Sequence, residues 1–120
     1  MTIRFLAPAR IELRDAIAYY NNKESQLGSR FGEAVKRAAS SIVQYPLAWP
    51  SASEVTRHCQ IRGFPYSLIY YLESNEVVIV AVMHKTRTST LEGAVDLALK
   101  ARLQQHYRIV FLPARARRGA

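Results

Sequence analysis

The sequence contains one cysteine, no long apolar run and no apolar leader at its start. A single thiol, Cys59, excludes an internal disulfide framework and is typical of a reducing compartment. The longest apolar run covers residues 77–83, whereas a membrane-spanning helix needs about 18 or more such residues. Because the N-terminus also lacks the apolar centre of a signal peptide, we expect a cytoplasmic protein with no membrane partner.

Several catalytic signatures are also missing. The five glycines are scattered, so there is no Gly-rich phosphate loop, and no G-x-S-x-G nucleophile elbow is present. His58 and Cys59 are adjacent and would point to opposite faces of a strand. His84 and His106 have no further ligand at the local spacing of a metal site. The sequence therefore predicts neither a metal nor a cofactor.

Acidic residues are scarce relative to basic ones. The 120 residues include 17 Lys and Arg against 9 Asp and Glu, a formal charge of +8, and 49% are hydrophobic. That composition supports one folded domain and favours an acidic partner, such as nucleic acid, an anionic surface or an acidic protein. Half of the charge, +4, lies in residues 88–120, and residues 1–87 carry the other half.

The first half of the chain has the pattern of a strand and two helices. Residues 2–6 alternate between apolar and polar, which is typical of a short strand. Residues 9–20 and 27–44 place apolar side chains three and four positions apart, which predicts two amphipathic helices. Pro46 ends the second helix, and the short connection predicts an antiparallel helical hairpin.

The second half has the pattern of strands. Residues 55–62 alternate, and residues 66–72 and 77–83 are nearly continuous apolar runs joined by a four-residue turn. These segments predict a three-stranded antiparallel meander whose central strands are covered on at least one side by the helices. The fold class is α+β, with a helical hairpin on one face of a small, mostly antiparallel sheet.

The end of the chain carries a further pattern. Ser89 and Glu92 have the spacing of a helix-capping box, and residues 91–103 have the apolar period of a third helix. Residues 107–112 have the pattern of a strand. We expect residues 1–87 to form the domain and residues 88–120 to be a basic extension, a helix followed by a strand.

Basic and aromatic side chains gather at the ends of the predicted strands. They are Arg57, Arg62, Tyr66, Tyr70, Tyr71, His84, Lys85 and Arg87. Arg and Lys hold phosphates, His moves protons, and Tyr stacks on bases, so these groups are the candidate site. The alternative is that the tyrosines are ordinary half-buried strand residues and the arginines are solvated.

Several motifs occur in a set order over residues 3–87. They are ARIELRDAIAYY (9–20), LGSRF (27–31), Pro46, Arg57 followed by GFPYSLIYY (63–71), and VVIVAVMHKTR (77–87). In this order and spacing they resemble the RelE/ParE superfamily of bacterial toxins from type II toxin–antitoxin modules. The resemblance implies a growth-inhibiting toxin of the plasmid-stabilisation type. It also implies a cognate antitoxin that wraps an amphipathic, often acidic segment around the toxin.

The superfamily divides by target. ParE-like members inhibit DNA gyrase and are not nucleases, whereas RelE-like members cleave mRNA in the ribosome with lysines and arginines on the sheet. No lysine lies between Lys36 and Lys85, so the lysine-rich RelE pattern is missing. The Phe-Pro-Tyr motif (64–66) with the later His and Arg resembles the ParE side. This reading implies a non-enzymatic toxin with target- or partner-binding residues Tyr66, Tyr70 and Lys85.

Two alternatives remain. A RelE-like, metal-independent endoribonuclease would act on ribosome-bound mRNA through the four candidate catalytic residues Arg57, Arg62, His84 and Arg87. An inactive relative that only binds is the other alternative, because the chain departs from the family after Arg87 and continues for 33 residues.

Overall fold

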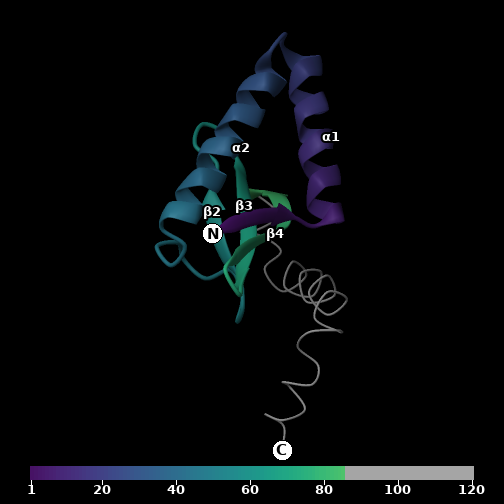
Figure 1. Cartoon of the computed structure of the whole chain (residues 1–120). Coiled ribbons are helices and arrows are strands. Elements are labelled where there is room, and N and C mark those ends of the chain that lie inside the picture. Colours follow the sequence, from purple (N-terminus) through teal and green to yellow (C-terminus); the bar gives the residue numbers. More distant parts are fainter. Residues whose placement is uncertain (86–120) are drawn as a thin grey trace, which may run out of the picture.

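The computed structural model describes residues 1–85, and the elements follow the predicted order (Figure 1). They are β1 (Thr2–Phe5), α1 (Ala7–Lys23), α2 (Leu27–Gln44), β2 (Arg57–Gln60), β3 (Tyr66–Glu73) and β4 (Glu76–His84). The strand predicted at residues 55–62 is shorter than expected. Its first residues form a turn in which the Ser53 hydroxyl accepts the Thr56 N–H, at 3.2 Å. The helix and strand predicted beyond Arg87 lie outside the described residues.

The four strands form one mixed sheet in the order β1-β4-β3-β2. The meander is antiparallel, as predicted, and β1 joins it beside β4 in parallel, from Thr2 opposite Glu76 to Phe5 opposite Ile79. A parallel neighbour requires a long crossover. Here the helical hairpin leads from β1 to β2, and β2 and β3 then lead to β4 beside β1. The central strand β4 is therefore paired on both sides.

Both helices lie on one face of the sheet, where they meet at one end and diverge (Figure 1). Apolar side chains of α2 and of the sheet fill the space beneath them. The most deeply buried are Phe31, Ile42, Ile61, Leu68, Tyr70, Val77 and Ile79. The Glu12 carboxylate on α1 accepts the Val82 N–H at 3.0 Å, beyond the point where β1 has ended. This bond anchors α1 to β4.

The opposite face of the sheet, which we call the second face, is apolar too. Its cluster consists of Ile69, Tyr71, Val78, Val80, Ala81 and Met83. Alternate residues of a strand point to opposite faces, so β4 contributes to both clusters. The alternation shifts at a β-bulge opposite Ile69 and Tyr70, so that the consecutive residues Val80 and Ala81 belong to the same cluster. The place of β4 in both clusters explains why its sequence is a continuous apolar run rather than an alternating one.

The two helices approach closely at the start of α2. The Gly28 N–H donates to the Asn21 side-chain oxygen at 2.8 Å. A Cβ at Gly28 would lie 2.4 Å from the Ile17 carbonyl oxygen and 2.6 Å from Asn21 Cγ. Only glycine fits there without a shift of backbone, which accounts for the glycine of the LGSRF motif.

Gly28→Ala should therefore destabilise the hairpin. Forcing a methyl group into packed backbone costs about 1–3 kcal/mol. Gly32→Ala is the matched control in the same helix, because its nearest neighbour would be Ile17 Cδ1 at 3.7 Å. A helical Gly→Ala change with room available stabilises by about 0.5–1 kcal/mol. Urea unfolding of both variants measures the difference, and equal stabilities would contradict the close approach.

Candidate functional site

Four of the predicted site residues lie where β2 ends, β3 begins and β4 ends. We call Arg62, Tyr66, His84 and Lys85 the basic sheet end. Tyr66 and His84 are opposite each other in the β3–β4 ladder, and their rings pack edge to face with centroids 5.1 Å apart. The Lys85 N–H donates to the Pro65 carbonyl at 2.7 Å. Arg62, His84 and Lys85 are exposed, so this end presents positive charge and hydrogen-bond donors to an acidic partner.

An aromatic cluster supports the basic sheet end from behind. Phe31 lies 5.2 Å from Tyr66 and 5.0 Å from Phe64, and Tyr20 lies 5.1 Å from Phe64, all between ring centroids. The cluster joins α1, α2 and the turn between β2 and β3. Such tilted and edge-to-face pairs stabilise by about 0.5–1.5 kcal/mol each beyond their buried area. The residues Phe64–Pro65–Tyr66 therefore hold Tyr66, and the His84 ring packed edge to face against it, in a defined position.

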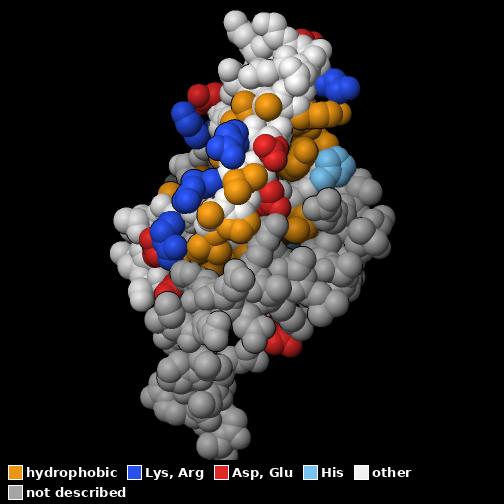
Figure 2. Space-filling view, turned by 90° about the vertical axis from the view of Figure 1, so that its right-hand side faces the viewer, with side chains coloured by type: hydrophobic (Ala, Val, Ile, Leu, Met, Phe, Trp, Pro, Cys, Tyr) orange, Lys and Arg blue, Asp and Glu red, His pale blue; other side chains and the backbone are white. Residues whose placement is uncertain are grey.

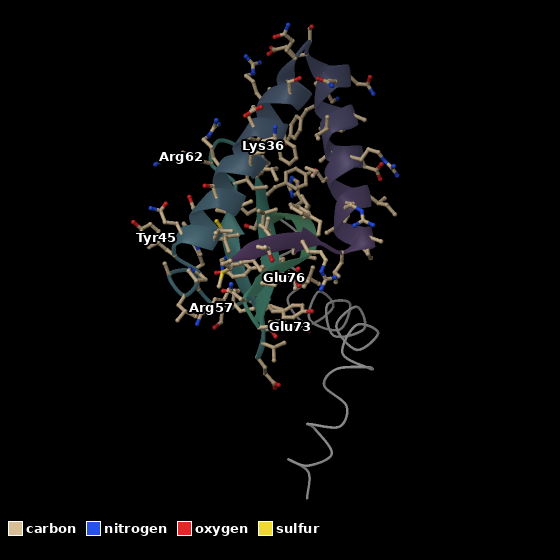
Figure 3. All side chains as sticks on the ribbon, viewed as in Figure 1. Lys36, Tyr45, Arg57, Arg62, Glu73 and Glu76 are labelled. Atoms are coloured by element: carbon tan, nitrogen blue, oxygen red, sulfur yellow. The ribbon has the colours of Figure 1, made fainter. Side chains whose placement is uncertain are left out.

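Arg57 and Tyr70 have a different place from the one the sequence suggested. They are opposite each other on β2 and β3, and Arg57 lies apart from Arg62 in Figure 3. The Arg57 guanidinium donates to the Leu47 and Trp49 carbonyls at 3.3 and 2.6 Å. The Tyr70 hydroxyl donates to the Pro46 carbonyl at 2.6 Å.

The predicted site is thus divided by the structure. Arg57 and Tyr70 fasten the loop after α2 onto the sheet, and the Tyr70 side chain is fully buried, so it offers no surface to a partner. Tyr71 lies on the second face of the sheet, where its hydroxyl donates to Glu73 at 3.0 Å. Arg87 lies outside the described residues. Of the eight predicted residues, four remain together at the basic sheet end.

The buried Tyr70 gives a test of this arrangement. Burial raises the pKa of its phenol to about 12, although the nearby Arg57 acts in the opposite direction. The unfolded phenol titrates near about 10, so the folded state holds the proton more tightly. This difference in pKa contributes to the free energy of unfolding. The contribution is fully present below about pH 10 and is lost as the pH rises through about 12, at up to about 1.4 kcal/mol per pH unit.

Tyr70→Phe should lose about 1 kcal/mol at neutral pH with its hydrogen bond. It should also show a smaller fall in stability between about pH 10 and 12 than the parent chain. Cys59, whose pKa burial raises to about 11, is retained in both proteins. Tyr45→Phe is the control, because that side chain is 59% exposed. Urea unfolding across this pH range measures the effect, and parallel pH profiles would contradict it.

A second surface was not predicted from the sequence. An apolar groove of about 520 Å³ lies between α1, α2 and β1. Its walls include Ile3, Phe5, Ile17, Val35, Ala39 and Val43, with Lys36 and Ser40 among the lining residues. Lys36 is exposed and pairs with Glu33 at 3.6 Å. The groove is therefore apolar inside and carries a basic side chain.

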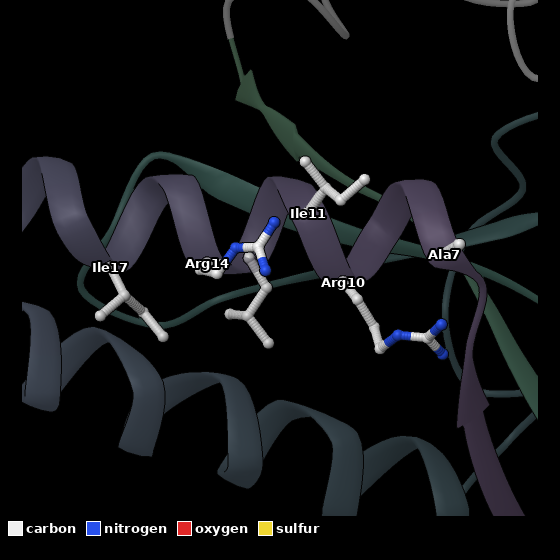
Figure 4. A pocket seen from close by; sticks show the side chains of 6 residues that line it. Ala7, Arg10, Ile11, Arg14 and Ile17 are labelled. Carbon is white, nitrogen blue, oxygen red and sulfur yellow. The ribbon is translucent and has the colours of Figure 1, made fainter.

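The groove continues along α1 into a second hollow of about 630 Å³ lined by Ala7, Arg10, Ile11, Leu13, Arg14 and Ile17. Leu13 and Ile17 line both hollows. Figure 4 shows Ile17 on the side facing α2, Ile11 pointing away from it, and Arg10 extending toward β1. Arg10 donates to the Phe5 carbonyl at 2.8 Å. On this side of the molecule, hydrophobic side chains are exposed among basic and acidic ones (Figure 2).

The sequence held a weak signal for this groove. Ile11 falls outside the apolar stripe of α1 and is 49% exposed, while Ala39 and Val43 widen the apolar stripe of α2. These residues form a groove only once β1 is placed beside β4, because Ile3 and Phe5 supply its third wall. The parallel position of β1 was not evident from periodicity.

The strand, the helical hairpin on one face and the meander define the RelE/ParE-like fold of α+β proteins. Residues 3–88 match the family described as "ParE toxin of type II toxin-antitoxin system, parDE". The match covers more than half of the chain, and the protein belongs to this family.

A solved structure described as "Chromosomal ParDE TA system from P. aeruginosa" has a similar fold, with a TM-score of 0.62. The alignment covers 70% of this chain and 95% of that one at 15% sequence identity. At this identity the likeness concerns the fold alone. We found no matching sequence among the curated proteins.

Two further observations concern residues 1–85 only. No group of three or more His, Cys, Asp or Glu side chains there has the arrangement of a metal site. Neither α1 nor α2 combines the length and the apolar character that crossing a membrane demands.

Proposed function

We propose that this ParE-family toxin arrests growth by binding DNA gyrase through the basic sheet end. We further propose that a cognate antitoxin neutralises it by occupying the groove between α1, α2 and β1. The observation that carries the proposal is the presence of two separate surfaces of different chemistry. One is an exposed group of basic side chains, and the other is an open apolar groove.

The groove suits an amphipathic helix with acidic flanks. Its apolar walls, among them Val35, Ala39 and Val43, would receive the apolar face of such a helix. Lys36 on one side and Arg10 and Arg14 along α1 would face its acidic residues. Complementary charge of this kind speeds association and selects the partner. The bulk of a bound antitoxin would then keep the target away.

Ala39→Arg should abolish antitoxin binding. Ala39 is partly exposed on α2, so the longer side chain fills the groove without entering the core. Loss of groove contacts should weaken binding at least a hundredfold, measured by calorimetry with the product of the neighbouring antitoxin reading frame. Ser29→Arg is the control, an exposed position of the same helix away from the groove. Unchanged affinity of Ala39→Arg would place the antitoxin elsewhere.

The basic sheet end is the surface we assign to the target. Its Arg62, His84 and Lys85 are exposed, and the support of Tyr66 by the aromatic cluster gives the surface a fixed shape. Two observations favour binding over RNA cleavage. Arg57, a candidate catalytic residue, is bonded to loop carbonyls, and the second face of the sheet has an apolar centre.

Lys85→Glu and Lys36→Glu should separate the two surfaces. Both lysines are exposed, so reversal of charge should leave the fold intact. Lys85→Glu should relieve the growth arrest that follows controlled expression. The purified variant should also inhibit gyrase supercoiling less than the parent protein does, while its affinity for the antitoxin is unchanged. Lys36→Glu should weaken binding of the antitoxin and leave growth arrest unchanged.

The alternatives predict other results in the same experiments. Cleavage of ribosome-bound mRNA with full gyrase activity would identify a RelE-like ribonuclease. In that case Arg57→Ala, Arg62→Ala and His84→Ala test the catalytic assignment. Absence of growth arrest from the parent chain would identify a relative that only binds. Either result contradicts gyrase as the target.

A further inference from the structure

A hollow of about 410 Å³ lies on α2, distinct from the groove and from the basic sheet end. It is formed by one face of α2 and by the turn between β2 and β3. The lining residues are Gln26, Ser29, Arg30, Glu33, Arg37 and Phe64. None of these residues lines the groove between α1, α2 and β1. The hollow is therefore a separate surface from the one assigned to the antitoxin.

The turn between β2 and β3 supplies one wall of the hollow. The Phe64 N–H donates to the Ile61 carbonyl at 3.2 Å, and Gly63 has a φ of 86°, as expected for the third residue of a type II turn. The second residue, Arg62, is exposed and pairs with no carboxylate of residues 1–85. Phe64 packs on Phe31 with ring centroids 5.0 Å apart, and its ring remains partly exposed where it lines the hollow.

The charges on the α2 wall do not balance. Arg30 pairs with Glu24, and Glu33 pairs with Lys36 at 3.6 Å. Within the described part of the chain, Arg37 has no such partner, although it is exposed. An uncompensated guanidinium thus stands in the same hollow as a partly exposed aromatic ring. This combination suits a carboxylate that is followed or preceded by an apolar side chain.

The mixed charge of the hollow favours a peptide over a nucleic acid. A continuous phosphate backbone would bring negative charge against Glu33, which is repulsive. A peptide can instead place single carboxylates at Arg37 and Arg62 and an apolar side chain on Phe64. The neutral polar side chains that line the hollow can bond to the backbone of such a peptide.

The position of the hollow connects it to the target surface. Arg62 at the tip of the turn is itself a member of the basic sheet end. Phe64 belongs to the aromatic cluster, in which Phe31 contacts both Phe64 and Tyr66. The basic sheet end and the hollow are therefore two parts of one surface that crosses the β2–β3 turn.

We propose that the target surface extends from the basic sheet end across this turn into the hollow, where it binds an acidic segment of DNA gyrase. The segment places an apolar side chain against Phe64 and carboxylates at Arg37 and Arg62. This inference rests on the proposed function, because it takes gyrase as the target. It adds a second point of contact, which lies on a helix rather than on the sheet.

Arg37→Glu tests the contact, with Lys23→Glu as its matched control. Both side chains are exposed, both changes alter the net charge equally, and the Lys23 ammonium lies over the Tyr19 ring of α1, 5.2 Å from its centroid. Arg37→Glu should weaken the binding of purified gyrase at least about tenfold and leave antitoxin affinity within about twofold. Lys23→Glu should leave both affinities within about twofold. Calorimetry measures all four.

A photo-crosslinking residue in place of Ser29 identifies what occupies the hollow. Ser29 is exposed and lines the hollow, so p-benzoylphenylalanine at this position should crosslink to a gyrase segment rich in Asp and Glu. The same residue in place of Lys23 should give no such product. Crosslinking from position 29 to DNA in a gyrase–DNA complex, or to the antitoxin and not to gyrase, would overturn the proposal.

The outcomes separate this inference from the proposed function. If Lys85→Glu weakens gyrase binding and Arg37→Glu does not, the hollow is no contact site while the basic sheet end stands. Equal losses in Arg37→Glu and Lys23→Glu would reflect net charge alone and would also contradict the contact. If the parent chain does not bind gyrase, the proposed function and this inference are both wrong.

Discussion

The structure depends on one strand that is apolar on both of its faces. β4 pairs with β1 on one side and β3 on the other, and its residues supply both apolar clusters. A strand of this kind is stable only when each face is covered. The helical hairpin covers one face, and Glu12 satisfies the Val82 N–H where β1 no longer reaches. The place of every other element follows from this strand.

The loop after α2 shows how strand residues serve to fix a neighbouring segment. Arg57 and Tyr70 donate to three carbonyls of this loop, those of Pro46, Leu47 and Trp49. The loop then lies against the edge of β2, with Ser51 bridged to Arg57. An edge strand with open backbone groups invites unwanted pairing with other chains. Side chains that resemble a phosphate site in sequence thus protect the sheet edge.

Periodicity alone predicted the order of six elements, the helical hairpin and the antiparallel meander, because each depends on local apolar spacing. It did not predict which sheet position β1 takes, since that pairing joins residues far apart in the chain. The groove beside β1 was missed for the same reason. Among the site residues, the neighbouring positions of Tyr66 and His84 follow from the pairing of adjacent antiparallel strands. The contacts of Arg57 and Tyr70 could not be predicted, because both bind a loop whose path no local sequence pattern specifies.

The parallel pairing of β1 has a consequence for the order in which the protein is assembled. Arg4 and its partner Glu76 are 72 residues apart in the chain, and contacts of such long range form late because a large loop must close first. During synthesis the first strand waits until residues 76–79 have left the ribosome. The groove, which needs Ile3 and Phe5 as a wall, is therefore completed only when almost the whole domain has been made.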